Sequence, residues 1–216
     1  MKKIILMGAM ALAVTAVNAQ DFKPALEKTF FAFDTTMNQD TKVEQSNKLS
    51  LIAKKWPDNW VTHYYLAYSK VNLSYFEKDN AKKDAYLDEA EKEREDAVAL
   101  LKKENDETYV LAAMIANGRL GVDPMNRWQK YGKIFTDNLQ NAKEANPDNP
   151  RMYYVQGVSK YFTPKQFGGG KKAALPYFEK AQVLFAKDNN KDIAKPYWGN
   201  DKNNYFLGLS KQEDKE

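Results

Sequence analysis

A short pattern recurs along this chain, and it limits the possible folds more than any other feature. The segment WPDNWVTHYYLAYSK at residues 56–70 is echoed by NPDNPRMYYVQGVSK at residues 146–160. Weaker copies follow at residues 108–116 and 204–211. A small residue takes the same place in each copy, at Ala67, Ala113, Gly157 and Gly208. The successive spacings of 46, 44 and 51 residues are typical of helical hairpins with their loops.

Each copy is followed by a second helical pattern, which is clearest at residues 171–185. There Ala174, Phe178, Ala181 and Phe185 recur at intervals of four, three and four residues, so they share one face of a helix. A small residue in the first helix allows the second to approach closely. Proline ends one repeat, and Asp58 or Asp148 is placed to cap the next helix. No run alternates with period two, so we predict an all-α fold with essentially no strand.

Several of these residues match the tetratricopeptide repeat. Gly157 in a first helix is followed by the apolar positions of residues 171–185, and Ala142 is followed five residues later by Pro147. The chain therefore resembles the tetratricopeptide family, as an exported bacterial member. The resemblance implies a right-handed solenoid of antiparallel helix pairs with about four repeats, as one domain at residues 20–210. A single compact helical bundle is the rival architecture, and residues 211–216 are predicted to form a polar tail.

The first nineteen residues are predicted to be a signal peptide, cleaved before Gln20. Lys2 and Lys3 precede an apolar run that ends in small residues at Val17 and Ala19. The apolar run is short for a membrane span, although a short membrane anchor is the alternative. No later segment is apolar enough to cross a bilayer. We therefore expect an exported protein in the periplasm, with secretion as a further possibility.

Composition excludes several function classes. The chain has no cysteine, and its one histidine, His63, has no neighbours that suggest a catalytic triad or a multi-histidine metal centre. We predict no catalytic residue, no metal site and no cofactor. The formal charge of +4 falls to about +2 without Lys2 and Lys3, and acids interleave with bases, which argues against nucleic-acid binding.

Two groups of residues are candidate binding sites. First helices line the concave face of the solenoid that the resemblance implies, and tyrosine suits recognition. The predicted groove residues are Tyr65, Tyr68, Tyr109 and Tyr153. The alternative for such tyrosines is packing between helices.

The second group is a glycine-rich loop that leads into a helix. Backbone N–H groups, a helix amino terminus and lysines would meet there, which is typical of an anion site. The predicted anion-binding loop consists of Gly168, Gly169, Gly170, Lys171 and Lys172. The alternative is a flexible connection with no ligand.

These observations favour a non-enzymatic scaffold that binds envelope or secreted proteins, or their extended peptides. The alternative is a protein that binds a small ligand, such as a glycan or an anion, through the tyrosine-lined groove and the glycine-rich loop. A hydrolase with a pair of acids is the third hypothesis. A change in tryptophan fluorescence on adding a ligand would favour the second hypothesis over the first.

Overall fold

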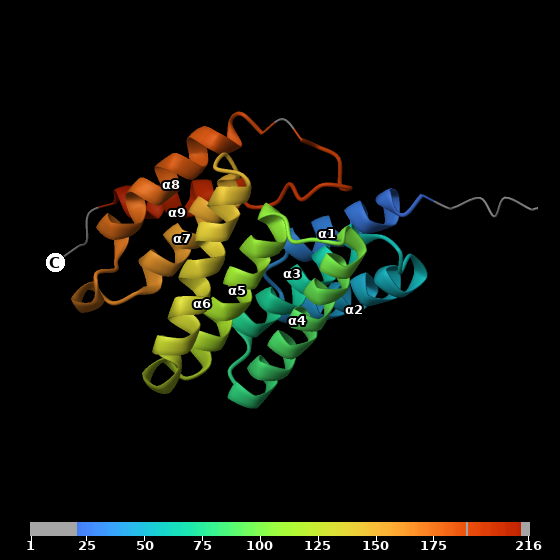
Figure 1. Ribbon diagram of the computed structural model, residues 1–216, viewed down its shortest axis with the longest axis horizontal. Coiled ribbons are helices and arrows are strands. Elements are labelled where there is room, and N and C mark those ends of the chain that lie inside the picture. The colour runs from blue at the N-terminus through green and yellow to red at the C-terminus, as the bar shows by residue number, and fades with distance from the viewer. Residues whose placement is uncertain (1–20, 189, 213–216) are drawn as a thin grey trace, which may run out of the picture.

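The computed structural model describes residues 21–188 and 190–212 (Figure 1). Over those ranges the protein consists of nine α-helices and one 3₁₀ turn, without a strand, so the predicted all-α class is confirmed. The elements are α1 (Lys23–Thr35), α2 (Gln39–Lys55), α3 (Trp60–Phe76), α4 (Asn80–Leu101), α5 (Asp106–Val122), α6 (Pro124–Ala145), α7 (Pro150–Phe162), η1 (Lys165–Phe167), α8 (Lys171–Phe185) and α9 (Asn200–Lys211).

Asparagine side chains begin the first helix of three successive pairs. Asn59, Asn105 and Asn149 each accept a hydrogen bond from a backbone N–H in the first turn of α3, α5 and α7. Such caps satisfy N–H groups that have no partner within the helix. The expectation that Asp58 or Asp148 supplies the cap is wrong, because the asparagine one residue later does so.

The helices pack in chain order as antiparallel pairs. The most extensive contacts join α3 with α4, α5 with α6, and α7 with α8, while α1 pairs with α2. Neighbouring pairs meet most extensively where α2 packs on α3 and α4 packs on α5, and the first helices also touch, α3 with α5 and α5 with α7. Helix α9 packs on α8. Figure 1 shows the pairs side by side in a row. This order agrees with the predicted helix pairs, and the handedness of a superhelix stays a prediction.

The small residues of the repeat pattern do not all serve the same purpose. A Cβ added at Gly157 would lie only 2.6 Å from Cε1 of Phe178, so glycine is what lets α7 and α8 approach here. Ala67 and Ala113 are likewise fully buried. Gly208 is exposed and has nothing within 4 Å of an added Cβ. The prediction that Gly208 also lets a second helix approach closely is therefore wrong, because no described helix packs on that side of α9.

The connection between α8 and α9 covers the first helices of the amino-terminal half. We call residues 190–199 of this connection the strap. The strap reaches α3 through Trp198, whose Nε1–H donates to the hydroxyl of Tyr64 at 2.8 Å. It also reaches α1, where Lys23 pairs with Asp192 at 3.0 Å. The strap thus joins the two ends of the described chain.

The predicted signal peptide lies outside the described residues, so its boundary stays a prediction. At the other end, α9 continues to Lys211, one residue into the segment predicted to be a polar tail. None of the helices in the described ranges is both long and apolar enough to cross a membrane.

Candidate ligand-binding surface

One face of α6 changes from buried to exposed along its length. Ala142 and Leu139 are buried near the carboxyl end, and Phe135, a turn earlier, is partly buried. Trp128 continues the same face at helical spacing but is 59% exposed. A large aromatic side chain that continues a core face of a helix is normally covered by a neighbouring element. The described chain does not cover Trp128, so the amino-terminal half of α6 has an exposed apolar surface.

A face of α7 shows the same change in the opposite direction along the chain. Arg151 and Val155 are buried, Val158 is partly buried, and Phe162, the last residue of the helix, is 68% exposed. Since neighbouring helices run antiparallel, the exposed ends of α6 and α7 lie at the same end of the molecule. Figure 1 shows α7 diverging from α6 toward this end, and the two helices make few contacts.

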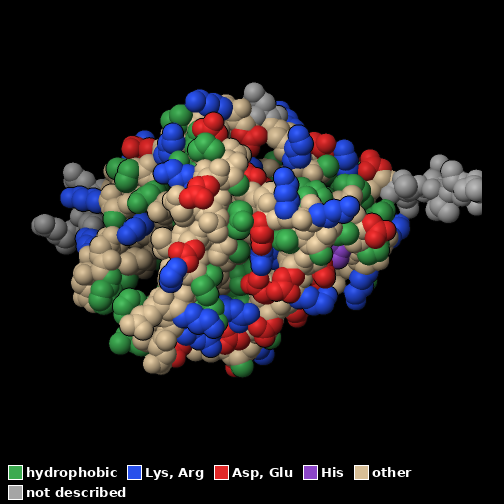
Figure 2. Space-filling view, in the orientation of Figure 1, with side chains coloured by type: hydrophobic (Ala, Val, Ile, Leu, Met, Phe, Trp, Pro, Cys, Tyr) green, Lys and Arg blue, Asp and Glu red, His purple; other side chains and the backbone are tan. Residues whose placement is uncertain are grey.

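The exposed ends of the two helices and the adjoining 3₁₀ turn carry large apolar side chains. We call this set the aromatic patch, and it consists of Met125, Trp128, Tyr131, Phe162 and Phe167. Figure 2 shows hydrophobic side chains gathered over the same end of α6 and α7. Flat aromatic rings stack well on one another, so such a patch suits a planar, apolar ligand.

The segments that form the aromatic patch have basic residues but no acidic ones. No Asp or Glu occurs in residues 124–136 or 149–178, although the chain has 29 acidic residues in all. Lysines and arginines occur in both segments, at Arg127, Lys130, Lys133, Arg151, Lys160, Lys165, Lys171 and Lys172. The ammonium group of Lys130 lies 5.1 Å from the centre of the Tyr131 ring. Arg127, Lys133 and Arg151 already pair with carboxylates of the chain, whereas Lys130 is exposed. An exposed ammonium group beside an apolar surface is complementary to an apolar ligand that carries carboxylates.

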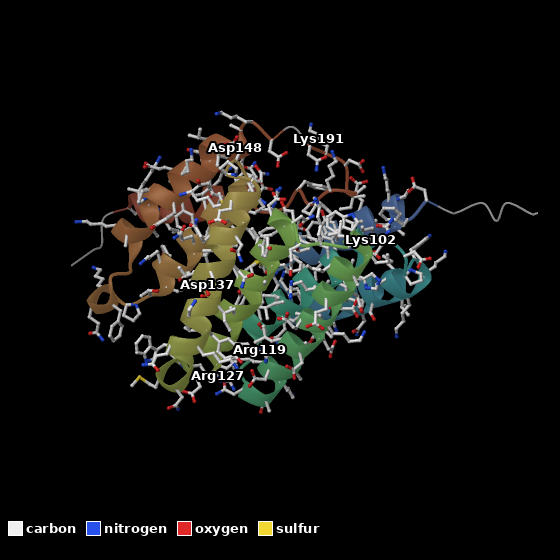
Figure 3. The ribbon with its side chains drawn as sticks, in the orientation of Figure 1. Lys102, Arg119, Arg127, Asp137, Asp148 and Lys191 are labelled. Carbon is white, nitrogen blue, oxygen red and sulfur yellow. The ribbon has the colours of Figure 1, made fainter. Side chains whose placement is uncertain are left out.

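The start of α6 is fixed from its other side. Arg127 binds both carboxylate oxygens of Asp84 in α4, at 2.7 and 2.8 Å, and Arg119 of α5 binds the same carboxylate at 3.3 Å. The hydrogen bonds from Arg127 hold the pKa of Asp84 below its usual value. Figure 3 shows Arg119 and Arg127 at the end of the molecule where α6 begins. This bidentate pair holds the helix end in place without covering its aromatic face.

The predicted tyrosine groove is closed for two of its four members. Tyr65 and Tyr68 are fully buried under the strap, where the Tyr68 ring lies 4.6 Å from that of Trp198. The expectation that these two tyrosines face an open groove is therefore wrong. Tyr109 and Tyr153 are partly buried, and their role in binding stays a prediction.

The glycine-rich loop is a tight connection in this structure. The N–H groups of Gly168, Gly169 and Gly170 donate to the backbone carbonyls of Lys165, Pro164 and Lys160, at 3.0, 3.2 and 2.8 Å. An anion would have to break these bonds to use the glycine amides. A Cβ at Gly169 would lie 2.0 Å from the carbonyl oxygen of Thr163, which gives the glycine a steric reason. Binding by Lys171 and Lys172 stays a prediction.

Two cavities elsewhere are less suited to an anionic planar ligand. One, of about 230 Å³, lies beside the buried ion pair of Glu107 and Arg151, whose atoms are 2.6 Å apart. It is smaller than most ligand pockets, which begin at about 300 Å³. The other, of about 500 Å³, lies next to Phe22 and Trp56, but Asp21 and Asp58 are among its walls. Lys55 also lines this cavity, but the two carboxylates outnumber its one ammonium group, so the net charge of the walls has the same sign as the ligand.

Sequence reasoning missed the aromatic patch because its residues are typical of a packed helix face. Trp128 and Phe162 continue their stripes in register, yet they are 59% and 68% exposed. The absence of acids from residue 149 to residue 178 is the one signal in the sequence that could have indicated this surface.

Fold and surface together define an all-α protein with a surface suited to a small, planar ligand. No protein-family model matches the chain, and no match was found among curated proteins. Among solved structures, the HusA haemophore from Porphyromonas gingivalis matches with a TM-score of 0.76 and 32% sequence identity. The match covers 92% of this chain and 97% of that one, so the chain belongs to the same family as HusA.

This relationship corrects the function favoured by the sequence. The relative is a haemophore, which is a ligand-binding protein, so the interpretation of the chain as a protein-interaction scaffold is wrong. The alternative, binding of a small ligand, has the better support. The tetratricopeptide resemblance agrees with the helical hairpins, but no repeat-family model confirms it.

Proposed function

We propose that this protein binds haem as its cargo and that it does so without catalysing a reaction. The observation that carries the proposal is the 32% identity to the HusA haemophore over almost the full length of both chains. The predicted signal peptide fits a protein that meets haem outside the cytoplasm, and export is part of the proposal.

The aromatic patch is the proposed haem site. Haem is a flat, apolar macrocycle with two carboxylate groups at one edge. Trp128 of α6 and Phe162 of α7 offer exposed aromatic rings to the macrocycle. Lys130 and Lys165 are exposed in the same acid-free segments, where they can pair with the carboxylates. The apolar contact supplies most of the affinity, and the lysines orient the ring.

The iron of haem has no histidine partner at this surface. His63 lies on α3, and both of its ring nitrogens already face acceptors, Glu93 and Pro57. Methionine and tyrosine also ligate haem iron in proteins, and the aromatic patch contains Met125 and Tyr131. We propose that ring stacking holds the haem and that one of these two side chains contacts the iron.

A spectroscopic titration tests both the function and the site. Haemin added to the purified chain should shift the Soret absorbance to saturation at one equivalent. Trp128→Ala and Phe162→Ala should each weaken binding by roughly tenfold or more, because each removes a stacked ring. Phe31→Ala is the matched control, since Phe31 of α1 is equally exposed but lies outside the patch.

The outcomes separate the function from its location. If the wild-type chain shows no saturable binding of haemin, the proposed function is wrong. If haemin binds and Trp128→Ala, Phe162→Ala and Phe31→Ala all match the wild type, the function stands and the aromatic patch is rejected as its site.

A further inference from the structure

The only histidine of the chain is held between two acceptors. His63 Nδ1 lies 2.7 Å from Oε2 of Glu93 on α4, and Nε2 lies 3.0 Å from the carbonyl oxygen of Pro57. Asp96 follows Glu93 by three residues, so it is on the same face of α4. One ligand atom from each of His63, Glu93 and Asp96 lies within 4.8 Å of the other two.

The contact with Pro57 decides which ring nitrogen is open to a ligand. A carbonyl oxygen only accepts hydrogen bonds, so Nε2 of His63 must carry a proton. In the neutral ring, Nδ1 then has a lone pair that points at the Glu93 carboxylate. Two acceptors 2.7 Å apart repel each other unless a proton or another cation lies between them. Metal-binding histidines are anchored in the same way, by a backbone carbonyl on the second nitrogen.

We propose that His63, Glu93 and Asp96 form a binding site for a divalent transition cation such as zinc. The cation would take the place of the shared proton, with Nδ1 of His63 and one carboxylate oxygen from each acid as ligands. One nitrogen and two oxygens, with room for water, make a donor set that suits zinc. Magnesium and calcium prefer oxygen alone, so they should bind weakly.

The surroundings of the cluster allow a cation to enter. The side chains of His63 and Glu93 are 12% and 18% exposed, while that of Asp96 is 45% exposed and forms the open side. Lys92 is the one competing cation that the structure places there, 3.2 Å from Asp96 and 3.9 Å from Glu93. Its side chain is 71% exposed and so can swing into solvent when a metal binds. Removing Lys92 should therefore tighten metal binding.

Calorimetric titration of the haem-free chain with zinc chloride tests this site after treatment with a chelator. We expect one zinc ion per chain and, below the pKa of His63, release of about one proton, read from the dependence of the heat on the buffer. Glu93→Gln and Asp96→Asn should weaken binding by about tenfold or more, and Lys92→Gln should strengthen it. Glu95→Gln is the matched control, because Glu95 is an exposed acid on the same helix.

Asp96→Asn is the main variant, because Asp96 is the most exposed of the three ligands and its replacement keeps the shape of the side chain. Zinc binding that Asp96→Asn and Glu93→Gln both leave unchanged would overturn the proposal, as would no binding at millimolar zinc. Magnesium chloride that binds as tightly as zinc chloride would also contradict it. The haemin titration does not depend on these residues, so either proposal can fail alone.

Discussion

The molecule has two clusters of aromatic side chains of similar composition, of which one is buried and the other is exposed. In the amino-terminal half, Tyr64, Tyr65 and Tyr68 are buried, and the strap contacts all three of them: Trp198 meets Tyr64 and Tyr68, and Tyr197 meets Tyr65. In the carboxyl-terminal half, Trp128 and Phe162 are 59% and 68% exposed, and the Phe162 ring touches only the edges of Tyr161 and Phe206 among the ring contacts of the described residues. Aromatic content alone therefore does not mark a binding surface. What matters is whether the chain supplies its own cover.

The largest difference that we expect between the two clusters is in the stability lost when a tryptophan of each is replaced. Trp198→Ala should lower the free energy of unfolding by about 3–5 kcal/mol, because it removes a 2% exposed ring and its hydrogen bond to Tyr64. Trp128→Ala should change the same quantity by only about 0.5 kcal/mol. Urea unfolding followed by circular dichroism measures both. Equal losses would show that Trp128 belongs to the core.

Two glycines test whether a neighbouring helix covers a given face of a single helix. Gly157→Ala should cost about 1–3 kcal/mol, because the added Cβ meets Phe178. Gly208→Ala should be neutral or stabilise by up to about 1 kcal/mol, since alanine favours a helix and meets nothing there. Thermal unfolding of both variants tests the prediction. A destabilised Gly208→Ala would indicate that α9 has a packing partner on its outer side.

The smallest effect that we expect is a pH dependence of the free energy of unfolding, caused by His63 in the amino-terminal half. The hydrogen bond that the protonated His63 ring donates to the Glu93 carboxylate raises the pKa of His63 above its ordinary value of 6.5. The folded state holds the His63 proton more tightly than the unfolded state does. The protonated His63–Glu93 pair therefore contributes fully to the free energy of unfolding below about pH 6.5, and this contribution is lost as the pH rises through the raised pKa of folded His63.

Glu93→Gln should remove this pH dependence, and unfolding by urea in a chelating buffer between pH 5 and 9 measures it. Charged groups that face His63 are Glu93, Asp96 and, beyond them, Lys92, and none belongs to the aromatic patch. An identical pH profile in wild type and Glu93→Gln would contradict the assignment.

The sequence predicted most of the fold, because the repeat is local. Helix spacing, the closing prolines and the small residue at Gly157 all follow from contacts within one hairpin. The strap was not predicted, since residues 190–199 have no periodicity and contact α1 and α3 from a distance of more than a hundred residues along the chain.

The candidate sites were predicted less well than the fold, because they too depend on contacts between residues far apart in the sequence. The tyrosine groove was placed on first helices, but nothing in the local pattern showed that the strap would cover them, with Trp198 on Tyr68 and Tyr197 on Tyr65. The His63 cluster joins residues thirty positions apart, so no motif indicated it. The exposure of the aromatic patch depends on how the helices pack on one another, which helix periodicity does not specify.

The most direct test of the haem site uses the four tryptophans of the chain, Trp56, Trp60, Trp128 and Trp198, as reporters of position. Each indole N–H gives its own signal in a proton–nitrogen correlation spectrum, and paramagnetic haemin broadens the signals of nearby groups. With the chain in excess over haemin, we expect the signal of Trp128 to broaden first while that of Trp198 persists. Loss of the Trp56 or Trp60 signal with Trp128 intact would place haem elsewhere and contradict this prediction.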